Sequence, residues 1–139
     1  MWRIFRPDAI AVLKDERARR SLHRYFEVME GNLPARFLVC KRVSVKVELS
    51  ANDEVLWRAH DHALRDFRKL LVDVDAHRVK LEDLKQPDPS LLDLKVELAR
   101  RILKSCHFCE RRCGVDRTAG ERGVCGVGEK SRIASEFMH

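Results

Sequence analysis

Residues 106–125 read CHFCERRCGVDRTAGERGVC, and this stretch decides how the C-terminal part of the chain folds. Its four cysteines have the spacing C-x2-C-x3-C-x11-C, and five of the six glycines of the chain fall between positions 114 and 128. So many glycines favour tight turns over regular secondary structure. A C-x2-C turn can place two sulfurs on one ion, and Gly114 lets the backbone curl so that a third sulfur reaches the same centre. We therefore predict one metal site formed by Cys106, Cys109, Cys113 and Cys125.

The spacing leaves the nature of this centre open. Four thiolates suit tetrahedral zinc and also an iron–sulfur cluster. A zinc ribbon usually has two C-x2-C turns, whereas the second half of this segment has single cysteines. Two disulfides or unligated thiols are the alternatives, since cytosolic proteins of hyperthermophiles do contain disulfides. We expect His107 to be exposed and not a ligand, and the fifth cysteine, Cys40, to lie in the core.

The chain is basic, with 139 residues, a net charge of +6 and a pI of 9.3. Positions 100–132 hold nine Lys or Arg against four Asp or Glu, so most of the excess surrounds the cysteines. Such cations offset thiolate charge and lower the pKa of nearby thiols. Those that lie among the cysteines are Arg111, Arg112, Arg117 and Arg122.

Composition also indicates the working temperature and the cellular compartment of the protein. Charged residues make up 36% of the chain, with one glutamine and two asparagines, as expected at high working temperature. There is no N-terminal apolar stretch of signal-peptide type and no run of the roughly 20 apolar residues that a bilayer requires. We therefore expect a cytoplasmic protein with no membrane partner, in which clustered thiols are reduced.

Outward from the cysteines, the sequence predicts a mainly α fold with a short β element. Ser90 and Asp93 have the spacing of a capping box and begin a helix that runs to Lys104. The segment Gln86-Pro87-Asp88-Pro89 is the predicted linker. It divides residues 1–86, a small helical domain with one or two strands, from residues 87–139, a helix plus a Gly-rich four-cysteine module.

The first 86 residues contain the other predicted elements. Asn52 caps a helix whose apolar stripe ends at Val74. An earlier helix begins with Pro7-Asp8-Ala9 and ends at Gly31. Residues 36–49 read RFLVCKRVSVKVEL, and their apolar and polar side chains alternate from Val43 to Leu49, which predicts a strand. A short helical stretch is expected over residues 77–84, and a strand is expected to begin over residues 131–137.

Residues 99–137 resemble the stretch that precedes the catalytic core of radical S-adenosylmethionine proteins, in particular those similar to pyruvate formate-lyase activating enzyme. That family has a C-x2-C-x3-C-G-V-x-R start and a G-E-x-G-x-C-G end, followed by a strand. The match covers less than a third of the chain. The matching positions here are Cys106, Cys109, Cys113, Gly114, Val115, Arg117, Gly120, Glu121, Gly123, Cys125 and Gly126.

The resemblance also implies what this chain lacks. In that family a C-x3-C-x2-C motif follows and holds the [4Fe–4S] cluster that binds S-adenosylmethionine. The motif is absent from this sequence. The four cysteines are therefore not the catalytic set, and no catalytic residue is assigned. The expected arrangement is the N-terminal region and cysteine module of such a protein without its catalytic core, which lies in a missing segment or on a separate chain.

Three functions follow from these patterns. The first is an accessory iron–sulfur or zinc module of a radical S-adenosylmethionine protein, serving electron relay, substrate docking or structural support. The second is a non-enzymatic zinc module whose basic surface binds nucleic acid, although only Phe108 is available for base stacking. The third is a helical interaction domain over residues 1–85 with the cysteines as an appendage. The residues that would meet phosphates in the second are Arg111, Arg112, Arg117, Arg122 and Lys130.

Overall fold

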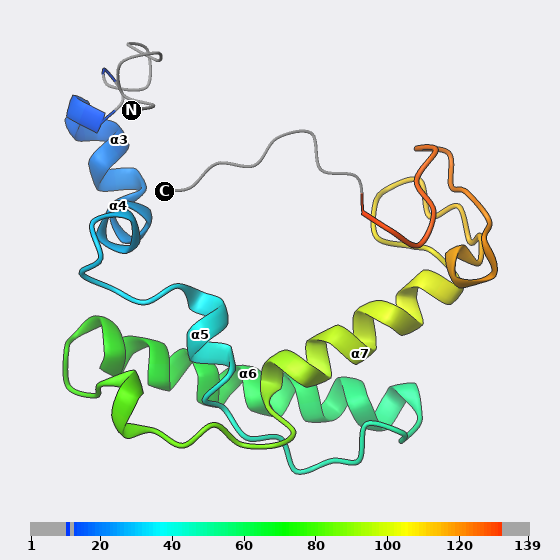
Figure 1. Cartoon of the computed structure of the whole chain (residues 1–139), viewed down its shortest axis with the longest axis horizontal. Coiled ribbons are helices and arrows are strands. Elements are labelled where there is room, and N and C mark those ends of the chain that lie inside the picture. The colour runs from blue at the N-terminus through cyan, green and yellow to red at the C-terminus, as the bar shows by residue number, and fades with distance from the viewer. Residues whose placement is uncertain (1–10, 12, 132–139) are drawn as a thin grey trace. The chain divides into compact units, whose positions relative to one another are not determined.

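The computed structural model describes residue 11 and residues 13–131 (Figure 1). The described elements are all helical, and the prediction of a mainly α protein is confirmed. No described helix has an apolar stretch long enough to cross a membrane. The strand expected over residues 131–137 falls almost entirely outside the described residues. The elements are α3 (Glu16–Ser21), α4 (His23–Met29), α5 (Arg36–Cys40), α6 (Asp53–Asp75), the 3-10 helix η1 (Leu81–Asp83), α7 (Leu91–Lys104) and the 3-10 helix η2 (Arg117–Ala119).

The chain forms two compact units, Met1–Ala35 and Arg36–His139. The predicted division at the 86–89 linker does not coincide with this boundary. The reason is that α7, which follows the linker, packs against both α5 and α6. The linker therefore joins helices of one core, and the helix that leads into the cysteines belongs to that core.

The first unit contains α3 and α4, where the sequence predicts a single helix. Asp15 caps α3, because its Oδ1 accepts hydrogen bonds from the backbone of Arg17 at 2.8 Å and of Ala18 at 3.0 Å. The helical path breaks at Leu22, whose φ and ψ are −112° and 27°. Helix α4 ends at Met29, and Gly31, the predicted stop, follows two residues later with a φ of 81°. The predicted start at Pro7 lies outside the described residues.

The strand predicted over residues 36–49 is wrong. Residues 36–40 form helix α5, and the alternating valines that follow adopt an extended path with a single bridge between Ser44 and Ser90. The backbone of Leu91 donates to Val43 at 2.8 Å, and then α7 begins. Because the partner segment turns at once into a helix, no ladder can extend from this bridge.

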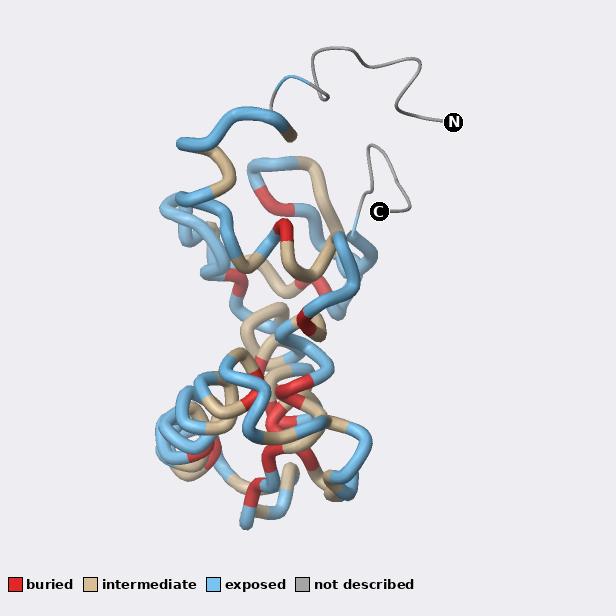
Figure 2. The backbone as a smooth tube through the Cα atoms, turned by 90° about the vertical axis from the view of Figure 1, so that its left-hand side faces the viewer, coloured by how far each residue is buried: buried red, intermediate tan, exposed pale blue. Residues whose placement is uncertain are grey.

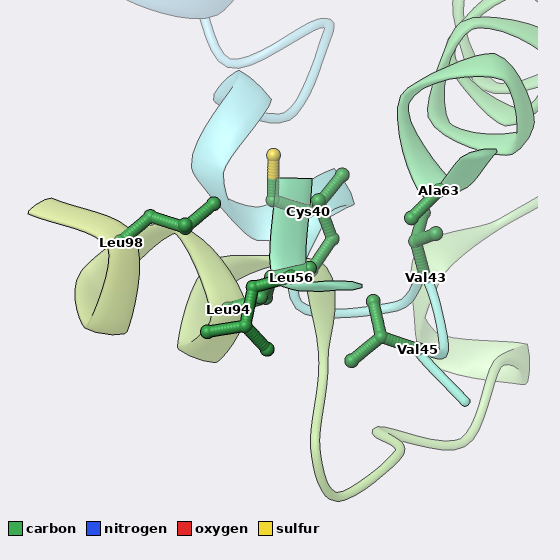
Figure 3. Close-up of a cluster of buried hydrophobic side chains, with 8 residues drawn as sticks. Cys40, Val43, Val45, Leu56, Ala63, Leu94 and Leu98 are labelled. Atoms are coloured by element: carbon green, nitrogen blue, oxygen red, sulfur yellow. The ribbon is translucent and has the colours of Figure 1, made fainter. Parts of the chain in front are cut away.

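The second unit is built around α6, whose predicted bounds are confirmed. The side chain of Asn52 accepts a hydrogen bond from the backbone of Val55 at 3.0 Å and begins the helix. Figure 3 shows the buried cluster that α6 shares with α5, α7 and the extended segment. Cys40 belongs to it, as predicted, and burial raises the pKa of its thiol. The cluster consists of Cys40, Val43, Val45, Leu56, Ala63, Leu91, Leu94 and Leu98.

Helix α7 leads from this core to the cysteines. The predicted capping box is present, with Ser90 N donating to Asp93 at 2.8 Å and Asp93 N donating to the Ser90 hydroxyl at 3.4 Å. Farther along, Arg101 donates to the backbone oxygens of Leu49 at 2.7 Å and Ala51 at 2.6 Å. The helix is thus attached to the core along its length. Figure 2 shows that the loops after it contain only scattered buried positions.

Candidate metal centre

The cysteine segment, residues 106–127, starts directly after α7 with a closed loop. Cys106 is 1% exposed, and its backbone N–H donates to the Val115 oxygen at 3.0 Å. Its own oxygen accepts a hydrogen bond from Gly114 N, also at 3.0 Å. These two bonds join the ends of the loop that carries three of the cysteines, and Cys106 lies at its base beside the helix.

Two Cys-Gly-Val tripeptides in the segment have the same local structure. In each the glycine has a positive φ, 67° at Gly114 and 70° at Gly126. In each the valine N–H donates to the sulfur of the cysteine two residues earlier, Cys113 or Cys125. In each the valine oxygen accepts a hydrogen bond from an earlier backbone N–H. Glycine favours this conformation because it has no Cβ to clash when φ is positive.

The two tripeptides bring their sulfurs together over Gly123. A Cβ atom added at Gly123 would lie 3.1 Å from the Sγ of Cys113 and 3.6 Å from the Sγ of Cys125. It would also lie 3.1 Å from Nη2 of Arg117. The absence of a side chain at Gly123 therefore leaves the room in which two sulfurs and a guanidinium meet.

Arg117 is buried at this point, with 8% of its surface exposed. Its Nη2 donates to the Sγ of Cys125 at 3.3 Å, and the guanidinium also donates to Cys106. The Sγ of Cys113 lies 4.0 Å from the Cys106 oxygen. Arg117 therefore contacts two of the four predicted ligands, Cys106 and Cys125, and the third, Cys113, lies near the Cys106 backbone.

The environment favours the thiolate form of two of these cysteines. The Val115 N–H, followed by that of Val124, lowers the pKa of the Cys113 thiol. The Val127 N–H, followed by the charge of Arg117, lowers the pKa of the Cys125 thiol. Hydrogen bonds and positive charge stabilise a thiolate more than a thiol, and the thiolate is the form that binds metals.

Cys109 is the predicted ligand that the structure does not bring to the others. Its side chain is exposed, and its backbone oxygen accepts a hydrogen bond from Arg112 N at 3.0 Å. Within the described residues, no three histidine, cysteine or acidic side chains are placed to hold a metal ion. All five cysteines are free thiols, with no disulfide in the described part. The donor chemistry and the turns fit a four-thiolate centre, whereas the sulfur positions do not form a closed ligand set.

The other polar residues of the segment separate into two groups. Arg117 contacts sulfur, whereas Arg111, Arg112 and Arg122 are exposed. His107 is exposed as predicted, and its Nδ1 lies 2.7 Å from the Ser105 oxygen. Burial therefore distinguishes Arg117 from the other three arginines as the cation that lies against sulfur.

Two features of the site were missed by sequence reasoning. The first is the repeated tripeptide Cys-Gly-Val at 113–115 and 125–127, whose identity was a visible signal of two similar turns. The second is the different burial of Arg117 and its neighbours. The sequence signal for it was weak: Asp116 precedes Arg117, and an aspartate before Thr118 is typical of a capped turn.

Comparison with known proteins adds one relative. The chain is 40% identical over 118 residues to an uncharacterized protein of Methanocaldococcus jannaschii. The match covers 85% of this chain and 32% of the relative. The chain therefore spans about a third of the relative's length. No protein-family model matches the chain, and no solved structure matches it.

Proposed function

We propose that the cysteine segment binds one metal centre, an iron–sulfur cluster or zinc, through Cys106, Cys109, Cys113 and Cys125. The observation that carries the proposal is that the sulfurs of Cys113 and Cys125 both lie close to Gly123, while Arg117 contacts Cys125 and Cys106. Four soft sulfur donors with depressed pKa values at two positions favour such a group. Binding requires the exposed side chain of Cys109 to turn toward the other three.

We further propose that this segment is an accessory module of a radical S-adenosylmethionine protein similar to pyruvate formate-lyase activating enzyme. The motif resemblance over residues 99–137 supports this. The relative supports it by its size, because two thirds of its length lies outside the match and leaves room for a catalytic core. S-adenosylmethionine and its [4Fe–4S] cluster would bind to that core, on a separate chain or segment, and this chain alone would not be catalytic.

The role within such a protein follows from the position of the segment. Cys106 lies two residues after the end of α7, so the site is attached to the helical core through a short connection. A centre held there is suited to electron relay, to substrate docking or to structural support in the reducing cytoplasm. An iron–sulfur cluster would supply a one-electron redox centre, and zinc would supply a structural cross-link.

A second candidate function is a zinc module that binds nucleic acid. It is favoured by the exposure of Arg111, Arg112, Arg122 and Lys130 in one segment, where they can meet phosphates. Arg117 cannot contribute, since it is buried against sulfur. Phe108, with 53% of its surface exposed, is available for stacking. Salt-sensitive binding to nucleic acid would be its signature.

The deciding experiment measures iron, acid-labile sulfide and zinc after anaerobic purification. The test variant is Cys113→Ser/Cys125→Ser, and the matched control is Cys40→Ala, which removes the cysteine of the core. We expect stoichiometric metal in the wild type and the control and its loss in the double variant. Iron with sulfide supports the redox module, and zinc alone supports a structural or nucleic-acid role. A metal-free wild type with two disulfides by mass contradicts both.

A further inference from the structure

Arg117 is the one described residue of the cysteine segment that carries a full charge and is buried. Its guanidinium contacts the sulfurs of Cys125 and Cys106. No carboxylate among the described residues forms an ion pair with it. Its Nε–H is buried and has no hydrogen-bond partner within the described structure. The same guanidinium therefore contacts sulfur through Nη2 and has a buried donor without a partner at Nε.

The buried charge and the unpaired donor are both unfavourable unless something anionic completes the site. A buried charge without a partner destabilises the folded state, and so does a buried donor that makes no hydrogen bond. Neutral thiols are weak acceptors and do not offset these costs. Thiolates do, and so does any further sulfur atom of a bound centre.

The turn that carries Arg117 is fixed by its own hydrogen bonds. Asp116 Oδ1 accepts from Thr118 N at 2.8 Å and from Ala119 N at 3.1 Å, which forms η2. Asp116 N donates to the carboxylate of Glu121 at 2.6 Å, and Glu121 N donates back to the Asp116 oxygen at 3.2 Å. The direction of the guanidinium is thus set by the backbone of residues 116–121 and not by a flexible loop.

We propose that Arg117 is a positioning residue of the metal centre. Its guanidinium contacts the sulfurs of Cys125 and Cys106, and its free Nε–H donates to a sulfur of the bound centre. This inference rests on the proposed metal site, and it deepens it by naming the group that balances the negative charge of the four thiolates. Partners of this kind, beyond the ligands, commonly change metal affinity by roughly 10–100-fold.

The chain offers a matched control in Arg122. It has the same charge, lies in the same segment between Cys113 and Cys125, and is exposed. A general effect of positive charge on thiolates would act through both arginines. An effect that requires the buried contact would act through Arg117 alone. Substituting each arginine in turn therefore distinguishes a general charge effect from an effect of the buried contact.

The test uses the full chain, reduced and metal-free, with Co(II) as the probe in competition with a chelator. The thiolate-to-cobalt charge-transfer band reports on sulfur ligation directly. We expect Arg117→Gln to bind Co(II) roughly 10–100-fold more weakly than the wild type. Arg117→Lys keeps a cation without the guanidinium fork, so we expect it to recover part of this loss. Arg122→Gln is expected to match the wild type.

Circular dichroism of each variant controls for folding, since α6 and α7 dominate the helical signal. If Arg117→Gln does not fold, Arg117→Lys decides, and wild-type affinity in a folded Arg117→Lys overturns the inference. Equal affinities of Arg117→Gln and Arg122→Gln also overturn it, while leaving the metal site in place. A wild type that takes up neither Co(II) nor iron with sulfide overturns the metal site and the role of Arg117 together.

Discussion

The Nη2 atom of Arg117 lies 3.3 Å from the Sγ atom of Cys125, so a buried cation and a sulfur face each other in the cysteine segment. Gly123 lies beside this pair, since a Cβ atom at Gly123 would be 3.1 Å from the Nη2 of Arg117 and 3.6 Å from the Sγ of Cys125. The contact explains why the segment can gather sulfurs with little apolar core of its own. It also defines where substitutions should affect metal binding and where they should affect only the helical core.

Gly123→Ala should disrupt the site without unfolding the helices. The added Cβ would lie 3.1 Å from both the Cys113 sulfur and the Arg117 guanidinium, closer than ordinary contact. We expect the metal content to fall by at least about half, measured by elemental analysis. Gly128→Ala is the control, because its Cβ would lie 3.8 Å from the nearest atom. Equal metal content in the two variants would contradict the close approach at Gly123.

Asp93→Asn should weaken α7 in a pH-dependent way. The hydrogen bond from the Ser90 hydroxyl is the main cause that lowers the pKa of Asp93. Its stabilisation is therefore present above the pKa of about 3.9 of an unfolded aspartate and is lost as the pH falls through the lower folded value. We expect a loss of about 1 kcal/mol in the free energy of unfolding at pH 7 and a smaller one near pH 3.

Urea denaturation at the two pH values measures this difference. Glu82→Gln, a substitution at an exposed carboxylate in η1, serves as the control and should show no comparable change. A loss from Asp93→Asn that stays constant with pH would show that the ionised capping box does not act as described.

Leu56→Ala should destabilise the core of the second unit. Leu56 is 0% exposed and packs where α6 meets α7 and the extended valines. Truncating such a side chain leaves a cavity and typically costs about 2–5 kcal/mol. Val72→Ala on the same helix is the control, because Val72 is 59% exposed and should change stability by less than about 0.5 kcal/mol. Thermal unfolding of both variants measures the difference.

Arg101→Gln should loosen the attachment of α7 to the segment before α6. Arg101 donates to the oxygens of Leu49 and Ala51 and pairs with Asp53 at 2.8 Å. Losing these bonds removes the side-chain attachment of α7 to residues 49–53, so we expect a lower unfolding midpoint in urea. The neighbouring exposed Arg100 supplies the control, as Arg100→Gln. Equal unfolding midpoints for the two variants would show that the hydrogen bonds of Arg101 do not stabilise the attachment of α7.

The sequence predicted the long helices because their signals are local. Asn52 and Ser90 are caps that act within one turn, and the stripe that ends at Val74 is a property of α6 alone. The error over residues 36–49 has the opposite cause. Val43 and Val45 do lie on an extended path and are buried, but a strand also needs a partner, and residues 90–91 turn into α7. Alternation of apolar and polar side chains indicates an extended backbone, but it does not show that a second strand lies beside it.

In the candidate site, too, the sequence predicted the local features and missed those that depend on packing. The glycine spacing predicted turns around the cysteines, since positive φ at Gly114 and Gly126 is a local requirement. Which arginine is buried depends on how η2 packs beside α7, and the sequence contains no record of that contact. The exposed position of Cys109 likewise follows from the path of the loop and not from the C-x2-C spacing.

The uneven burial of the four cysteines gives the site an inner and an outer edge. Cys106 is covered at the base of the loop, whereas Cys109 and Cys125 are exposed. Oxidants, chelators and incoming ions therefore meet the outer pair first. A metal would enter and leave past Cys109 and Cys125, and oxidative damage would start there while Cys106 was still protected. The order in which the four sulfurs react is set by the path from solvent.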